Sequence, residues 1–175
     1  MKKNGATMWF FHDVTSFTLY SVAIFQAGLG YERGLKMKII ENINRNNFQS
    51  FGTLLEFEGD ETNFEILVKE EVKPWRLAVF RVWDHGTQVL ECHPDSYESF
   101  EPLKGIGILL TARPESPEDY HAFLLDKPVC LNKGVWHQLI SLTEEVQVKI
   151  TENLEVGTLF YELDSIVQPV LAEKS

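Results

Sequence analysis

A succession of short apolar segments, separated by turn-forming residues, constrains the fold of this chain most. After residue 75 these segments recur at near-regular spacing, divided by stretches rich in Gly, Pro, Asp and Asn such as Asp84–Thr87, which is predicted to be a hairpin turn. Such a pattern, with little sign of helix, is typical of a β-sandwich or closed β-barrel. Strands are predicted at residues 38–43, 53–58, 64–69, 75–83, 88–93, 98–102, 106–112, 121–125, 129–131, 137–142, 146–151 and 158–163.

One short helix is predicted near the start of this pattern, at residues 44–52. Asn46 or Asn47 is suited to cap its N-terminus, and Gly52 is suited to end it. Phe48 and Phe51 would lie on one face of the helix. The sequence therefore predicts a mainly β fold with a short N-terminal helix.

The chain of 175 residues, 44% of them hydrophobic, is long enough for one compact domain with a sizeable core. Residues 1–36 differ from the rest, because they are basic on balance in a chain whose net charge is −10. Residues 17–29 are apolar and follow Lys2-Lys3, as in a secretory signal, but His12 and Asp13 interrupt the approach. This stretch is also too short to cross a membrane. We interpret residues 1–36 as an N-terminal extension outside the fold, and residues 37–175 as the folded domain.

The charge balance restricts the partners of the protein. Lys and Arg number 16 against 26 Asp and Glu, so the overall field repels nucleic acids and anionic membrane surfaces. A small anionic substrate can still bind through a local cation, a metal or backbone N–H groups. We therefore expect a small-molecule partner, no nucleic acid and no membrane.

The two cysteines, Cys92 and Cys130, are too few for a disulfide-based secreted scaffold, and no CxxC motif is present. This favours a cytoplasmic location. We interpret both cysteines as small buried hydrophobic residues. The alternative is a shared reactive or metal-ligating role, since both lie near the histidines described next.

Four residues have the spacing of a metal site. Glu91 and His93 are two apart in a predicted strand and so point to the same face, while Glu98 follows after a turn. His137 would lie opposite them if the sheet closes. Two imidazoles and one or two carboxylates suit a first-row divalent metal with open positions. The sequence thus predicts metal ligands at Glu91, His93, Glu98 and His137.

The spacing of these residues resembles the two motifs of the cupin superfamily. Gly86, Glu91-Cys92-His93, Glu98 and Gly105 are similar to the first motif, with Glu91 one position early and in place of a His. The run from Asn132 to His137 is similar to the second motif, except that Asn132 replaces a Pro. The resemblance implies a cupin-like jelly-roll β-barrel.

Three further runs resemble the ureidoglycolate lyase family more specifically. They are Leu90-Glu91-Cys92-His93-Pro94, Ser99 to Gly105, and Leu131 to Gln138, and Phe48 to Gly52 is similar to an early family motif. The resemblance extends from about Met37 to the C-terminus. It implies a homodimeric carbon–nitrogen lyase that splits ureidoglycolate into glyoxylate and urea during allantoin breakdown, with nickel as a stimulating metal.

The reaction implied by this resemblance needs a base, an acid for the leaving nitrogen and a cation for the carboxylate. His137 or His93 is a candidate base when not bound to metal, and Lys104 or Lys133 is a candidate partner for the carboxylate. We therefore predict catalytic roles for His93, His137 and Lys104, and substrate binding by Asn132, Lys133, Gln138 and Trp136. The alternative is that both lysines are solvated turn residues and that Trp136 belongs to the core.

The chain also departs from the family runs. Asn132 and Gln138 replace histidines, and Cys92 replaces an arginine. Asn and Gln can orient a substrate but cannot exchange protons at neutral pH. A non-catalytic or differently specific cupin that binds a small organic acid or sugar is therefore the second hypothesis, and a cupin isomerase or other hydrolase is the third.

Overall fold

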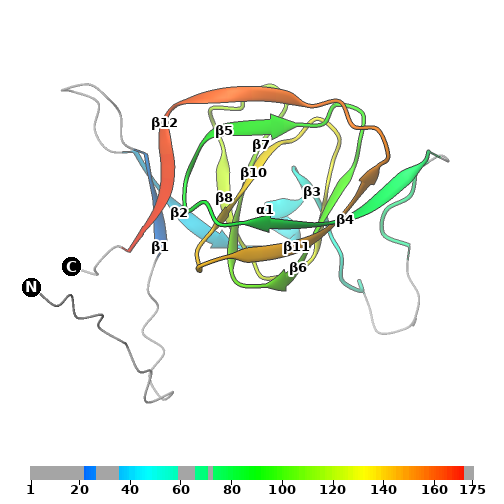
Figure 1. Cartoon of the computed structure of the whole chain (residues 1–175), viewed down its shortest axis with the longest axis horizontal. Coiled ribbons are helices and arrows are strands. Elements are labelled where there is room, and N and C mark those ends of the chain that lie inside the picture. The colour runs from blue at the N-terminus through cyan, green and yellow to red at the C-terminus, as the bar shows by residue number, and fades with distance from the viewer. Residues whose placement is uncertain (1–21, 27–35, 59–65, 71–72, 172–175) are drawn as a thin grey trace, which may run out of the picture.

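The computed structural model describes residues 22–26, 36–58, 66–70 and 73–171. In this part of the chain, strands curl around a common core with one short helix (Figure 1). In chain order the elements are β1 (Val22–Gln26), β2 (Lys36–Asn42), α1 (Arg45–Phe48), β3 (Gly52–Leu54), β4 (Trp75–Val82), β5 (Thr87–Cys92), β6 (Glu98–Lys104), β7 (Gly107–Ala112), β8 (His121–Leu125), β9 (Val129–Leu131), β10 (Trp136–Ser141), β11 (Val146–Asn153) and β12 (Leu159–Leu171).

The strands form two sheets. One has the order β1-β12-β5-β10-β7-β8-β2 and closes into a barrel because β1 also pairs with β2, and the other has the order β3-β9-β6-β11-β4. In Figure 1, β5 and β12 lie at the top, and β6 and β11 lie at the bottom. The strands from β4 to β11 divide between the sheets in the orders β4-β11-β6-β9 and β5-β10-β7-β8. These nested orders are those of a jelly roll, so the predicted mainly β, cupin-like jelly-roll fold is confirmed.

The middle of the first sheet, around β7, is buried on both faces. One buried cluster joins the two sheets and includes Phe100 and Val148 from one and Leu109 from the other. A second cluster lies on the opposite face of the first sheet and includes Ile108 and Leu110. Neighbouring residues of β7 thus belong to different clusters, which explains why every residue of that strand is buried. Because of this packing, one face of the first sheet points toward the second sheet, and side chains on that face can reach a site between the sheets.

Helix α1 is shorter than the predicted span of 44–52, and its N-cap lies before the two predicted caps. Its N-cap is Asn44, not Asn46 or Asn47, because the Asn44 side chain accepts hydrogen bonds from the backbone N–H groups of both. The side chain of Asn47 accepts from the Asn44 N–H in return. Phe48 and Phe51 are both buried, and Gly52 begins β3 and does not end the helix, which stops at Phe48. Among the described residues, no helix has the length and apolar character needed to span a membrane.

The structure differs from the predicted elements in several connections. Residues 22–26, in the segment expected to be an extension, form β1 and pair with β2 and β12, while residues 1–21 and 27–35 lie outside the described residues. Residues 66–69 form no strand, and residues 64–65 are not described. The Asp84–Thr87 turn makes no hairpin, because β4 and β5 belong to different sheets. The turn instead crosses between the sheets, and the backbone N–H of Ser141 donates to the Asp84 carbonyl at 2.8 Å.

Candidate metal centre

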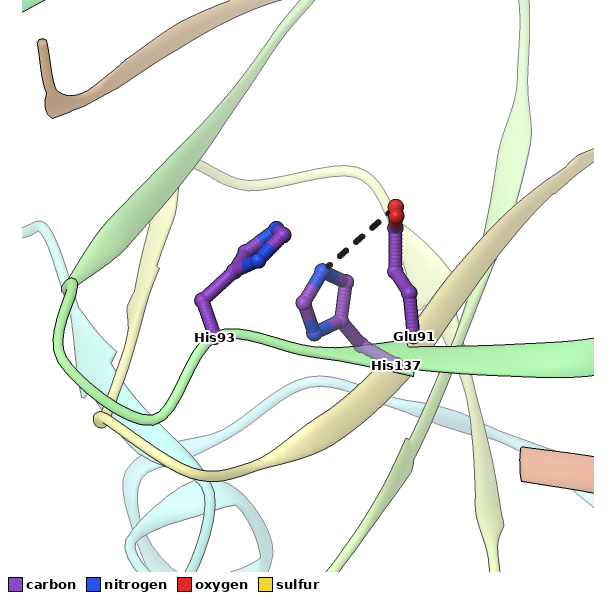
Figure 2. A group of neighbouring side chains, drawn as sticks. All are labelled: Glu91, His93 and His137. Carbon is purple, nitrogen blue, oxygen red and sulfur yellow. Dashed lines mark ion pairs between the residues drawn. The ribbon is translucent and has the colours of Figure 1, made fainter. Parts of the chain in front are cut away.

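The two histidines predicted to converge lie together between the two sheets (Figure 2). His93 directly follows β5, and His137 lies on the neighbouring strand β10, opposite Glu91 in the strand register. The centres of the imidazole rings are 5.2 Å apart, and both rings are buried. Nε2 of His137 lies 3.8 Å from Oε1 of Glu91, as the dashed line in Figure 2 marks. The two histidines therefore converge as predicted, but from neighbouring strands of one sheet and not from opposite walls of the barrel.

Glu98 reaches the same point from the other sheet, at the start of β6. Its Oε2 atom lies 2.9 Å from Nε2 of His137 and 3.3 Å from Nε2 of His93. The contact with His137 lacks hydrogen-bond geometry, so that Glu98 Oε2 and His137 Nε2 are both buried without a hydrogen-bond partner among the described residues. We call Glu91, His93, Glu98 and His137 the His/Glu cluster.

The outer nitrogens of both rings face backbone carbonyls. Nδ1 of His137 lies 3.0 Å from the carbonyl oxygen of Val135, and Nδ1 of His93 lies 3.3 Å from that of Gly157. A carbonyl accepts only, so Nδ1 of His137 carries the proton and donates it, whereas Nδ1 of His93 also lies 3.3 Å from the Thr158 hydroxyl, which can donate or accept. In the neutral imidazole of His137, Nε2 then presents a lone pair toward Glu98. Carbonyl partners of this kind commonly hold metal-binding histidines in orientation.

Electrostatics at Glu98 and His93 favour a positive charge between them. Burial alone would raise the pKa of Glu98, but the adjacent His137 and His93 lower it to about 2. Burial opposes protonation of His93, but the adjacent carboxylate of Glu98, together with the charge of Glu91, raises its pKa above the usual value. A carboxylate oxygen facing the Nε2 lone pair of His137 requires a proton or another cation between them.

The donor atoms fit a divalent metal. Glu91, His93 and His137 can each offer one ligand atom within 4.8 Å of the others, and so can His93, Glu98 and Glu152. Around an ion with ligand distances of about 2.1 Å, donors are separated by roughly 3–3.5 Å, close to the separations of Glu98 from the two rings. The orphaned Glu98 and His137 atoms are what such an ion would satisfy. A His and carboxylate set suits first-row divalent metals.

A cavity of about 210 Å³ opens beside the His/Glu cluster. Its walls include Phe80, Phe100, Ile150, Gln138, Arg76 and Glu152. This volume lies below the roughly 300–1,000 Å³ of pockets for drug-sized ligands. The cavity therefore suits a small polar molecule, held between aromatic walls and the charged groups.

Arg76 and Glu152 were not predicted as site residues. Nη2 of Arg76 lies 2.7 Å from Oε1 of Glu152, whose side chain is 8% exposed, while the Arg76 side chain is 48% exposed. Arg76 is the one Lys or Arg among the described residues that line this cavity. The sequence held a signal for Glu152, because it continues the inward-facing alternation of Val148 and Ile150 on β11.

The other predicted site residues lie elsewhere, apart from Gln138, which lines the cavity. Lys104 is paired with Glu145 in a separate surface hollow, and Lys133 is paired with Glu70. Neither lysine lines the cavity. Asn132 is exposed in the turn before β10. Trp136 packs on the opposite face of the first sheet and donates from Nε1 to the Pro114 carbonyl at 3.1 Å, as expected of a structural residue.

Both cysteines are buried and unpaired, as small hydrophobic residues are. Burial raises the pKa of Cys92, and burial together with the charge of Glu98 raises that of Cys130 to about 11. Both thiols therefore stay protonated at neutral pH and are poor nucleophiles and ligands.

Fold and site together define a jelly-roll protein with an enclosed His/Glu cluster fit for a divalent metal. No family model matches the chain, and no curated protein matches it. Among solved structures it is similar to QdtA, a sugar 3,4-ketoisomerase from Thermoanaerobacterium thermosaccharolyticum in complex with TDP, with 11% identity and a TM-score of 0.40 over 81% of this chain and 89% of that one. It is also similar to the Mn(II)-containing oxalate decarboxylase of Bacillus subtilis, with 17% identity and a TM-score of 0.33 over 63% of this chain and 29% of that one.

Proposed function

We propose that the protein is a divalent-metal-dependent carbon–nitrogen lyase that acts on a small hydroxy acid, with ureidoglycolate as the substrate. The reaction and substrate come from the sequence resemblance. The observation that supports the metal is that Glu98 Oε2 and His137 Nε2 are buried 2.9 Å apart with no hydrogen bond. A cation between them satisfies both atoms and His93 together.

His93, His137 and Glu98 would hold the metal, with Glu91 beside them as a fourth ligand. A bound divalent cation supplies positive charge that polarises the substrate hydroxyl oxygen. Nickel is the metal that the family resemblance implies. Because the ligand role occupies both Nε2 atoms, the histidines are then no longer available as the base, and another cavity residue must move the proton.

Glu152 is the residue best placed to move this proton. One of its carboxylate oxygens lies within 4.8 Å of the candidate ligand atoms of His93 and Glu98, and Arg76 holds this carboxylate on the cavity wall. It accepts the proton of the substrate hydroxyl as the carbonyl of glyoxylate forms. The electron pair of the broken C–N bond passes to the nitrogen of urea, which takes the proton from Glu152. The reaction is balanced without an oxidant or a reductant.

Arg76 is the cation that would bind the substrate carboxylate. Glu152 contacts its Nε at 2.9 Å and its Nη2 at 2.7 Å through one oxygen, which leaves further N–H donors on the half-exposed guanidinium. A guanidinium can pair with a carboxylate through two parallel hydrogen bonds. This role was predicted for Lys104 or Lys133, neither of which lines the cavity.

The direct test is to strip the purified protein of metal, reload it with Ni²⁺ or Mn²⁺, and follow glyoxylate release from racemic ureidoglycolate. We expect release above the spontaneous rate with the reloaded protein and loss of that excess after chelation. Release at the spontaneous rate under every metal would exclude the lyase.

A non-catalytic binder of a small acid is the second candidate. Gln138, which lines the cavity where the family has a histidine, can donate and accept hydrogen bonds but cannot transfer a proton. Thermal stabilisation by small organic acids without any turnover is the result expected of this binder.

A further inference from the structure

His93 lies just beyond the strand ladder that holds its neighbours. His137 is within β10, between β5 and β7, whereas β5 ends at Cys92 and His93 follows it (Figure 2). The backbone of His93 is held by the turn before β10, because its carbonyl oxygen accepts from the Gly134 N–H at 3.0 Å. The direction of its imidazole therefore depends on side-chain contacts made outside the ladder.

Thr158 makes one of these contacts. The last pair of the antiparallel ladder between β5 and β12 is Cys92 with Leu159, so His93 and Thr158 are the next residues on each side. Side chains of directly opposed residues lie on the same face of a sheet. Oγ1 of Thr158 accordingly lies 3.3 Å from Nδ1 of His93, the same distance as the Gly157 carbonyl oxygen.

The connection between β11 and β12, residues 154–158, is fixed to the rest of the site at its start. The N–H of Asn153 donates to Oγ of Ser96 at 3.0 Å, in the turn that follows His93. The N–H of Leu154 donates to the Pro74 carbonyl at 2.8 Å, just before β4. These bonds tie the connection both to the turn after His93 and to the strand that carries Arg76.

Metal binding by His93 decides what the Thr158 hydroxyl can do. A neutral imidazole that binds a metal through Nε2 keeps its proton on Nδ1. Nδ1 then donates, and the oxygens that face it, of Thr158 and Gly157, accept. The Thr158 O–H is left to donate elsewhere. Thr158 is exposed and lines the cavity, so this donor faces a molecule bound there.

We propose that Thr158 is a positioning residue of the metal centre, whose hydroxyl links His93 to the ligand in the cavity. It accepts from Nδ1 of His93 and donates its own proton to an acceptor oxygen of the bound small acid. The inference rests on the metal centre proposed above. It adds a neutral hydrogen-bond donor to the charged Arg76 on the cavity wall, so the site favours acids with a second acceptor oxygen.

Competition for Ni²⁺ with a chromophoric chelator tests the link to His93 without an assay of activity. Thr158→Val keeps the shape of the side chain and removes the hydroxyl. We expect it to weaken Ni²⁺ binding about 10-fold, at the low end for residues that orient metal-binding histidines, because the Gly157 carbonyl remains. Thr158→Ser keeps the hydroxyl and should bind within about threefold of the wild type. Thr53→Val, on β3 and outside the cavity, is the control and should bind like the wild type.

His93→Gln in the same assay separates failure of this inference from failure of the metal centre. Weaker Ni²⁺ binding by His93→Gln, with wild-type binding by Thr158→Val, would overturn the role of Thr158 and leave the metal centre intact. Wild-type binding by both variants would overturn the metal centre and the inference together. Equal weakening in Thr158→Val and Thr158→Ser would show that the hydroxyl is not the cause and would also overturn the inference.

Calorimetric titration with glyoxylate, the expected product, tests the second hydrogen bond. With every variant saturated with Ni²⁺, we expect Thr158→Val to bind glyoxylate about 2- to 10-fold more weakly than the wild type, as for the loss of one neutral hydrogen bond. Thr158→Ser should bind within about twofold. Equal affinities for Thr158→Val and the wild type would overturn the link to the ligand. A wild type that binds no glyoxylate would instead overturn the proposed substrate, while Ni²⁺ competition still decides the role of Thr158 toward His93.

Discussion

Nε2 of His137 and Oε2 of Glu98 meet across the two sheets at 2.9 Å without a hydrogen bond. With Nδ1 of His137 directed at the Val135 carbonyl, the neutral ring turns a lone pair toward the carboxylate. Two facing acceptors destabilise the folded state unless a cation lies between them. The stability of the packing between the two sheets at this contact therefore depends on the cation that the site binds.

Replacing either cluster histidine should remove the metal. We expect His93→Gln and His137→Gln to lower the affinity for Ni²⁺ or Mn²⁺ at least about 100-fold, because each substitution deletes a ligand atom. Metal content after dialysis, measured by mass spectrometry, reports this without any assay of activity. His121→Gln is the control, since His121 is partly exposed and pairs with Glu41 away from the cavity. Equal metal content in all three variants would contradict the site.

The metal-free protein should be most stable in mildly acidic solution. The pKa of Glu98 is lowered to about 2, so its contribution is present above its ordinary value of 4.5 and is lost as the pH falls toward 2. The pKa of His93 is raised above 6.5, so its contribution is full below 6.5 and is lost as the pH rises through the raised value. The melting temperature should therefore peak between these two ordinary values, 4.5 and 6.5.

Thermal melts of chelated protein from about pH 3 to 9 measure this peak. Glu98→Gln is the matched variant, because a neutral amide removes the charge that couples to both rings. Its profile should be flatter on both sides of the peak than that of the wild type. Parallel profiles for the two proteins would show that Glu98 is not the source of the pH dependence.

Local patterns in the sequence were sufficient to predict much of the sheet structure. The strands at 121–125 and 129–131 are observed with the predicted bounds, because turn residues enclose each of them. The period of two also predicted that Glu91 and His93 share a face. Pairing between distant strands is not a local property, however. The crossing of the Asp84–Thr87 turn to another sheet was therefore missed.

The same limit applies to the site. Lys104 and Lys133 were chosen because they adjoin the motifs in sequence, yet the cation on the cavity wall comes from β4, well before the first motif. Arg76 alternates along β4 with the same period as Ala78 and Phe80, so the sequence predicted that the three side chains lie on one face of the strand. The sequence did not show which sheet Arg76 faces, because that depends on the pairing of β4 with β11.

Arg76→Gln should weaken binding of an anionic substrate. Loss of a charge-assisted pair worth about 1.5–3 kcal/mol predicts a KM or Kd for ureidoglycolate raised roughly 10- to 150-fold, with retained metal content. Arg76→Lys should recover part of this, because it keeps the charge but not the planar donors. Lys104→Gln and Lys133→Gln should change the KM less than about twofold, as side chains outside the cavity. A larger effect from either lysine than from Arg76 would instead support the prediction that Lys104 or Lys133 binds the substrate carboxylate.

Glu152→Gln should separate proton transfer from binding. The amide keeps a hydrogen bond to Arg76 but cannot accept the hydroxyl proton, so kcat should fall about 10²- to 10⁴-fold while the KM changes little. Glu162→Gln, at an exposed position on β12, is the control. Metal content must be measured in parallel, because Glu152 is also within ligand reach of His93 and Glu98. If metal is lost together with activity, Glu152 is a ligand, and the proton must be moved by another carboxylate on the cavity wall, such as Glu91.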